Sequence, residues 1–384
     1  MCRLSLELTP IKARGLSTSP TASSSHSASH QCIRHPSRLL NRTIARFFGG
    51  PKSSRLQPEH VVIGTVTFTD LINEIINTTD KLVNIRELCI ESCNLPLDYD
   101  PRPLFTSFWS SFGRNLYTLS FCGNLEGCRT FINSNPTFDG LRELHVEFTN
   151  NIFRVDPLTD MVILVDVFLP FINSLAPRLL LLGLWSWAFV DLSVFFSRLA
   201  PFPYLKALNI RTPFNLAFGD GSSGLKRFIC DSSATLLRVE LRLNPTGLPA
   251  DPLAEEPLSQ WLSRCISDER FFSHLQILDI YPTNLDAGMD FLLGCIRRTS
   301  NSLVQLIVRD RCLRNSEIKV ILGAASSCSN LTYFRMNIWR LDVDLTDLLA
   351  LKLPSIERLW LSIGENAANN PNYLIVRGRH PKLE

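Results

Sequence analysis

A short apolar pattern recurs along most of this chain, and it constrains the fold more than any other feature. In the segment 85–95, IRELCIESCNL, apolar residues occupy the first, fourth, sixth and eleventh positions, and a cysteine occupies the ninth. This spacing fits neither the 3.6-residue period of an amphipathic helix nor the two-residue alternation of a plain strand. A short strand that points its apolar residues inward and then bends accounts for the spacing.

The same pattern returns nine further times. The first apolar positions of the ten units are Ile85, Leu116, Leu141, Leu179, Leu205, Leu236, Leu275, Leu303, Leu331 and Ile356. Neighbouring units are 25 to 39 residues apart. The leucine-rich repeat has the template L-x-x-L-x-L-x-x-N/C-x-L and a period of about 20–29 residues. One match would carry little weight because leucine is common, but ten in series predict a repeat protein.

Segments with helical periodicity lie between these units. The clearest are 68–82, 257–272, 286–300 and 315–327. Cap signals open three of them, at Thr69 and Asp70, at Asp286 and at Asn315, and Pro257 suits the first turn of the other. Each unit is therefore predicted to be a short strand followed by a helix. A single unit cannot bury its apolar face, so stacked units are expected to share one continuous core.

We predict an α/β fold, a leucine-rich-repeat solenoid (horseshoe) of about ten irregular repeats over residues 60–365. Parallel strands are expected on its concave face and helices on its convex face. Residues 1–59 are predicted to be a disordered, basic, serine-rich tail, because the stretch 15–37 has too few core-forming residues to offset its ordering entropy. Residues 366–384 are predicted to be a C-terminal tail. A basic amphipathic helix at 38–48 would make the N-terminal tail a mitochondrial presequence, and an error in the gene prediction is a further alternative.

Charge and cysteine content exclude several classes of function. Residues 1–55 hold nine Lys and Arg but one acid, Glu7, which leaves 30 basic and 35 acidic residues in the rest of the chain, a net charge of −5. A net acidic body does not favour nucleic-acid binding. The eleven cysteines include no C-x-x-C pair. They are expected to be free thiols in a reducing compartment rather than zinc ligands.

Motifs of catalysis and of membrane insertion are missing from the sequence. It contains no G-x-S-x-G, P-loop, H-E-x-x-H or G-x-G-x-x-G motif. The most apolar run, 179–189, is too short to cross a bilayer, and the first residues contain no apolar signal region. We therefore expect no enzymatic activity, no cofactor or metal, and no membrane contact. The expected location is cytoplasmic or nuclear, with a mitochondrial location as the alternative.

The residues between the core leucines of each strand are expected to project onto the concave face, which is the usual binding surface of a solenoid. The candidate partner-binding residues in these slots are His145, Trp185, Arg211, Arg242, Asp279, Tyr281, Arg309, Arg335 and Trp360. Arg, Tyr and Trp are enriched in interface hot spots. Arginines beside Asp279 and Glu240 suit a protein partner of mixed, partly acidic charge, and a solvated face with compensating salt bridges is the alternative. Exposed Trp185 and Trp360 rings would favour contact with a partner, or packing under a loop.

The order of these strands and irregular helices, with a cysteine such as Cys93 at the turn position, resembles the F-box/leucine-rich-repeat proteins common in fungi. The resemblance covers roughly residues 60–365. In that family an N-terminal F-box recruits a cullin-type ubiquitin ligase and the repeats hold the substrate. The resemblance implies a substrate-recognition component, with a cullin-ligase adaptor as a second partner. Residues 1–59 show no Leu-Pro opening followed by apolar helices, so a stand-alone leucine-rich-repeat binding scaffold without a ligase link is the alternative.

Overall fold

The computed structural model describes residues 3–7, 68–92, 99–149, 157–186, 192–212, 224–243, 255–280, 286–364 and 373–377. Twelve strands form one sheet, in which every strand lies beside its neighbours in the sequence. They are β1 (Arg3–Glu7), β2 (Glu87–Glu91), β3 (Thr118–Gly123), β4 (Glu143–Phe148), β5 (Leu181–Ser186), β6 (Ala207–Thr212), β7 (Arg238–Leu243), β8 (Ile277–Ile280), β9 (Gln305–Leu313), β10 (Tyr333–Ile338), β11 (Arg358–Ile363) and β12 (Tyr373–Arg377). Strands β1 to β11 are parallel, and β12 pairs antiparallel with β11.

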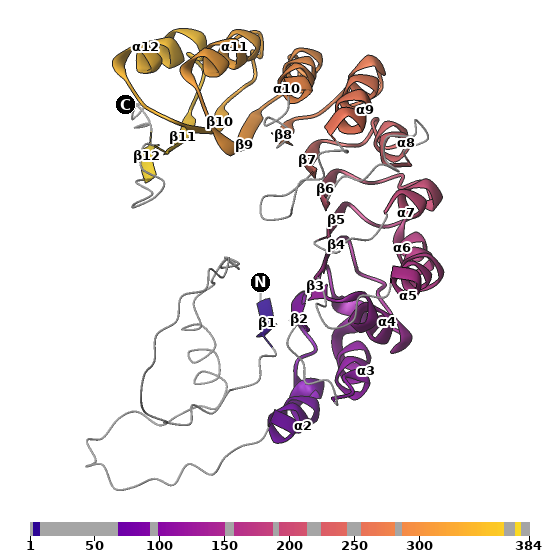
Figure 1. Cartoon of the computed structure of the whole chain (residues 1–384). Coiled ribbons are helices and arrows are strands. Elements are labelled where there is room, and N and C mark those ends of the chain that lie inside the picture. Colours follow the sequence, from indigo (N-terminus) through magenta and orange to yellow (C-terminus); the bar gives the residue numbers. More distant parts are fainter. Residues whose placement is uncertain are drawn as a thin grey trace, which may run out of the picture.

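Helices alternate with the strands and form the outer layer of an arc, while the strands form its inner layer (Figure 1). They are α2 (Phe68–Thr78), α3 (Arg102–Phe112), α4 (Leu125–Asn133), α5 (Pro157–Val162), α6 (Leu169–Leu175), α7 (Ser193–Arg198), α8 (Gly224–Asp231), α9 (Glu255–Ser267), α10 (Asp286–Arg298), α11 (Asn315–Ala325) and α12 (Val343–Lys352). A π-helical stretch, η3 (Ile163–Phe168), joins α5 to α6, and the 3-10 turns η1 (Thr79–Lys81) and η2 (Gly113–Asn115) follow α2 and α3. The predicted α/β class with a parallel sheet is confirmed.

Each of the ten recurring units forms one strand, from β2 to β11. Every strand begins two residues after the first apolar position of its unit, as Glu87 follows Ile85 and Leu181 follows Leu179. The two apolar residues of the alternation point away from the inner face and are buried in β2 to β10. In β11 only Leu361 is buried, because this strand lies near the end of the stack. The repeated spacing therefore reflects burial between the sheet and the helix layer.

Two strands lie outside the range predicted for the solenoid. Strand β1 falls in the segment expected to be a tail and pairs in parallel with β2. Strand β12 falls in the predicted C-terminal tail and pairs with β11. Both cover an edge strand whose backbone N–H and C=O groups would otherwise lack a ladder partner. The segment 38–48, interpreted above as a possible presequence, lies outside the described residues.

Contacts between aromatic rings join helices α3, α4 and α6. The ring of Phe131 in α4 lies 5.8 Å from that of Phe105 and 5.2 Å from that of Trp109, both in α3, and 5.9 Å from that of Phe171 in α6. These edge-on contacts add to the burial of large apolar surfaces. Helices α3, α4 and α6 are thus fixed to one another, and the buried residues form one core cluster along the stack. In the described part of the chain, no helix combines the length and apolar character needed to cross a membrane.

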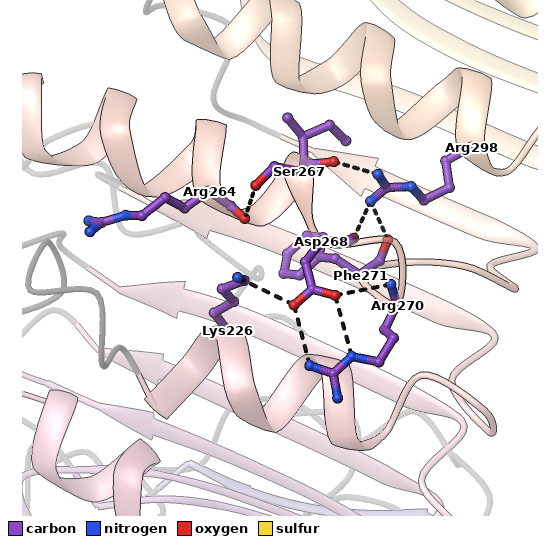
Figure 2. Close-up of polar contacts among 8 residues, drawn as sticks. Lys226, Arg264, Ser267, Asp268, Arg270, Phe271 and Arg298 are labelled. Atoms are coloured by element: carbon purple, nitrogen blue, oxygen red, sulfur yellow. Dashed lines mark hydrogen bonds and ion pairs between the residues drawn. The ribbon is translucent and has the colours of Figure 1, made fainter.

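A polar junction links α8, α9 and α10 (Figure 2). Arg298, the last residue of α10, donates hydrogen bonds to the carbonyl oxygens of Asp268 (2.7 Å), Phe271 (3.0 Å) and Ile266, at the end of α9. The Asp268 carboxylate contacts Lys226 of α8 at 3.3 Å and accepts a hydrogen bond from the backbone N–H of Arg270. Hydrogen bonds from Arg270 hold the pKa of Asp268 well below its usual range, at about 2. The junction satisfies carbonyl groups that a helix end leaves without an internal partner.

Replacing Arg298 with methionine is expected to lower the free energy of unfolding by about 2–3 kcal/mol, because three carbonyl groups lose a charged donor. Urea denaturation of the full chain would measure the loss. Arg297→Met is the matched control, since Arg297 lies in the same last turn of α10 and is exposed. Equal losses in the two variants would show that the hydrogen bonds of Arg298 contribute nothing beyond its charge.

Candidate protein-binding face

Three columns of side chains run along the inner face of the sheet, because alternate residues of a strand point to the same side. The central column contains Cys89, Ser120, His145, Gly183, Asn209, Glu240, Asp279, Ile307, Arg335 and Trp360. The preceding column contains Glu87, Thr118, Glu143, Leu181, Ala207, Arg238, Ile277, Gln305, Tyr333 and Arg358. The following column contains Glu91, Cys122, Glu147, Trp185, Arg211 and Arg242.

The strand register brings most of the predicted binding residues onto this face. His145, Asp279, Arg335 and Trp360 belong to the central column, and Trp185, Arg211 and Arg242 belong to the following column. Arg309 lies two residues after Ile307 in β9 and therefore points to the same side. Tyr281 lies outside the described residues. The described members of the predicted set thus lie in two adjacent columns of the same face.

Arginines stack on aromatic rings of the adjacent strand at three places. The Cζ atom of Arg211 lies 4.4 Å from the ring centroid of Trp185, and that of Arg335 lies 4.8 Å from the centroid of Trp360. The preceding column contributes a third pair, in which Arg358 lies 5.1 Å from the ring of Tyr333. Both tryptophans are half-buried. The expectation of exposed rings is therefore wrong, because a neighbouring guanidinium group covers each of them.

Three polar side chains in the middle of the central column are buried. Asn209, Glu240 and Asp279 have exposed fractions of 5%, 8% and 1%. The expectation that Asp279 and Glu240 are exposed is therefore wrong. An Arg309 Nη2 group donates to Asp279 Oδ2 at 2.5 Å. Burial nevertheless raises the pKa of Asp279 to about 6, with Arg309 opposing the rise and Glu240 adding to it.

Several buried polar atoms of this face have no hydrogen-bond partner in the described part of the chain. They are Trp185 Nε1, Asn209 Oδ1, Arg238 Nε, Asp279 Oδ1, Arg335 Nε and Trp360 Nε1. A buried donor or acceptor without a partner costs about 1–3 kcal/mol, and folded proteins contain few of them. All six belong to strands β5 to β11. This concentration marks the face as a site that would gain hydrogen bonds if a partner displaced the side chains that cover these atoms.

His145 occupies a position with a different environment. It lies beside Gly183 of the next strand, where a Cβ atom would come within 2.6 Å of the imidazole Nδ1. Gly183 therefore provides the space into which the ring folds. Burial lowers the pKa of His145; the nearby Glu143 opposes this and Arg238 adds to it. The imidazole is thus a neutral hydrogen-bonding group at neutral pH.

Residues of the preceding column were missed by the sequence analysis. Arg238, Tyr333 and Arg358 share the face with the predicted set, and each stands directly before the second apolar residue of its unit. The candidate residues named from the sequence occupy the two slots after that residue, whereas these three occupy the slot before it. Reading the third slot of the same template would have found them.

No model of a known protein family matches the chain, and no curated protein matches it. Within the described residues, no group of three or more His, Cys, Asp or Glu side chains is placed to hold a metal ion. The buried Cys128 and Cys295 are free thiols, and burial raises the pKa of each well above its usual range. The face formed by β5 to β11 therefore remains the candidate site.

Proposed function

We propose that this chain is a leucine-rich-repeat horseshoe that binds a protein partner on its concave face. The single observation that carries the proposal is the set of buried, unsatisfied polar atoms on β5 to β11. The Trp185–Arg211 and Trp360–Arg335 pairs stand among these atoms, and Trp and Arg are the residue types that dominate interface hot spots. A repeat protein of this kind offers an extended, curved surface rather than a closed pocket, which suits a polypeptide better than a small molecule.

The ligase role rests on the family resemblance. We propose a substrate-recognition component of a cullin-type ubiquitin ligase, in which the concave face holds the substrate and a cullin-ligase adaptor binds elsewhere. A stand-alone binding scaffold is the second candidate. In both cases the inner face of the arc carries the binding function.

Affinity capture from native extract separates the two candidates. The baits are the full chain and a version that lacks residues 1–59. Recovery of cullin-ligase subunits with the full chain only would support the ligase role and place the recruiting segment in residues 1–59. Absence of these subunits from both baits, with other proteins retained, would contradict the ligase role and favour the scaffold. Absence of any retained protein would contradict both.

A further inference from the structure

Charge is segregated along the inner face of the arc. Strands β2 to β4 present acidic side chains in the two outer columns, namely Glu87, Glu91, Glu143 and Glu147. None of the other column residues of these three strands is Lys or Arg. Strands β6 to β11 instead present arginines, namely Arg211, Arg238, Arg242, Arg309, Arg335 and Arg358. The face is therefore acidic at its N-terminal end and basic through the rest of its length.

The acidic residues of the basic part lie beneath its surface. Glu240 and Asp279 are 8% and 1% exposed, whereas Arg358 at the end of the arc is exposed and Arg211, Arg238 and Arg242 are half-buried. A partner that approaches this part therefore meets guanidinium groups first. The two carboxylates lower the net positive charge of this part of the face. A partner with single, spaced negative charges therefore fits it better than a partner with one densely charged group.

The unsatisfied atoms indicate the kind of molecule that fits. Trp185 Nε1, Arg238 Nε, Arg335 Nε and Trp360 Nε1 are donors, whereas Asn209 Oδ1 is an acceptor. A simple anion would satisfy the donors alone. An extended polypeptide supplies both carbonyl oxygens and N–H groups at regular intervals. The mixture of donors and acceptors therefore favours a peptide segment.

The length of the face sets the length of the segment. Neighbouring strands lie about 4.8 Å apart, so the span from β2 to β11 is roughly 43 Å. An extended chain rises about 3.3 Å per residue, so about 13 residues would cover this span. A segment of that size can contact the acidic and the basic part of the face at the same time.

We propose that the partner binds through an extended segment whose charge changes sign along its length. Its basic residues lie over β2 to β4 and its acidic residues lie over β6 to β11. The inference rests on the proposed protein-binding function and adds the chemistry and the direction of the bound segment. Because complementary charges steer encounter and fix register, the charge pattern also selects one orientation of the segment over the reverse.

Selection from a random library of 16-residue peptides displayed on phage tests the proposal. The target is the immobilised full chain at low ionic strength, where charge contacts are least screened. Enriched peptides are expected to carry Lys and Arg in one half and Asp and Glu in the other. Their affinities are then measured by fluorescence polarisation with synthetic labelled copies.

Neutralising variants at the two ends locate the two halves of the peptide. Glu87→Gln on β2 and Arg358→Gln on β11 are each expected to weaken binding about threefold to fivefold, the range of a single exposed charge pair. Asp290→Asn in α10 and Lys319→Gln in α11 are matched controls with exposed side chains on the outer helices. These controls are expected to leave the affinity unchanged within twofold. Thermal melts check that all variants keep the fold.

The outcomes separate failure of the inference from failure of the proposed function. Peptides without segregated charge, or segregated peptides that are insensitive to Glu87→Gln or to Arg358→Gln, would overturn the inference. If such peptides still lose affinity with Trp360→Ala, the proposed binding face stands. No enriched peptide, or peptides insensitive to every substitution on the inner face, would overturn both.

Discussion

Replacement of Arg309 by methionine is expected to lower the free energy of unfolding by about 3 kcal/mol at pH 8. The reason is that the Asp279 carboxylate would remain buried without its charged partner, which costs about 3–5 kcal/mol in proteins. The lower end of this range applies because the pair is only partly shielded from water: the Arg309 side chain is 28% exposed, whereas that of Asp279 is 2% exposed. Denaturant unfolding monitored by circular dichroism would measure the change.

The double variant Arg309→Met with Asp279→Asn is the control for this prediction. Removing both charges of a buried pair is often neutral or stabilising, whereas leaving a buried carboxylate without its charged partner is strongly destabilising. The double variant is therefore expected to recover to within about 1 kcal/mol of the unmodified protein. A double variant as unstable as the single one would show that Arg309 acts through packing rather than through the carboxylate.

The pH dependence of stability gives a second readout of the same pair. The pKa of Asp279 is about 6 in the folded protein and has a usual value of 3.8. Its favourable contribution is therefore fully present below pH 3.8 and is lost as the pH rises through about 6. Asp279→Asn is expected to abolish this loss and to make the protein more stable at pH 8, by up to about 3 kcal/mol. A variant less stable than the unmodified protein at pH 8 would contradict the assignment.

The largest effect on binding is expected from Arg335→Ala combined with Trp360→Ala. A Trp or Arg at the centre of an interface contributes about 2 kcal/mol or more, which corresponds to an affinity at least about 30-fold weaker. The measurement is the dissociation constant for a protein that the unmodified chain retains from native extract. Both side chains lie on the inner face and stack on each other, so the two substitutions remove one contact unit.

Trp339→Ala provides the matched control. Trp339 directly follows β10 and is 51% exposed, but it is not part of the three columns. Its replacement is expected to leave the affinity unchanged within twofold. Equal losses for Trp339→Ala and for the Arg335 and Trp360 pair would show that exposed apolar area anywhere on the protein drives the binding.

The order of the strands was predictable from sequence because each strand repeats one spacing. A buried pair such as Leu182 and Leu184 recurs at equivalent positions of β2 to β10 and lies beside the corresponding pairs of the neighbouring strands. The pattern is therefore local and periodic. Strands β1 and β12 were not predictable in the same way. They pair with β2 and β11 at the two ends of the stack through backbone N–H and C=O groups. Because every sequence has these groups, no residue pattern marks such a strand.

The inner face was predictable only in part. Period-two alternation places Arg211 and Arg335 on that side of the sheet, and the sequence shows this. Asp279 is buried and accepts a hydrogen bond from Arg309 of the next strand, and this approach is a property of the assembled sheet. The stacking of Arg335 on Trp360 likewise joins two strands that are separated by a helix, α12. To predict such contacts one must know the register between neighbouring strands, and the spacing of leucines alone does not give that register.

The most direct test of the central claim is photo-crosslinking from the inner face. A benzoylphenylalanine replaces Tyr333, which lies in the preceding column, in the full chain exposed to native extract. The control carries the same group in place of Tyr204, which lies just before β6 and is 60% exposed. A crosslinked partner protein is expected from position 333 and none from position 204. Crosslinking from position 204 alone would show that the partner does not occupy the inner face of the arc.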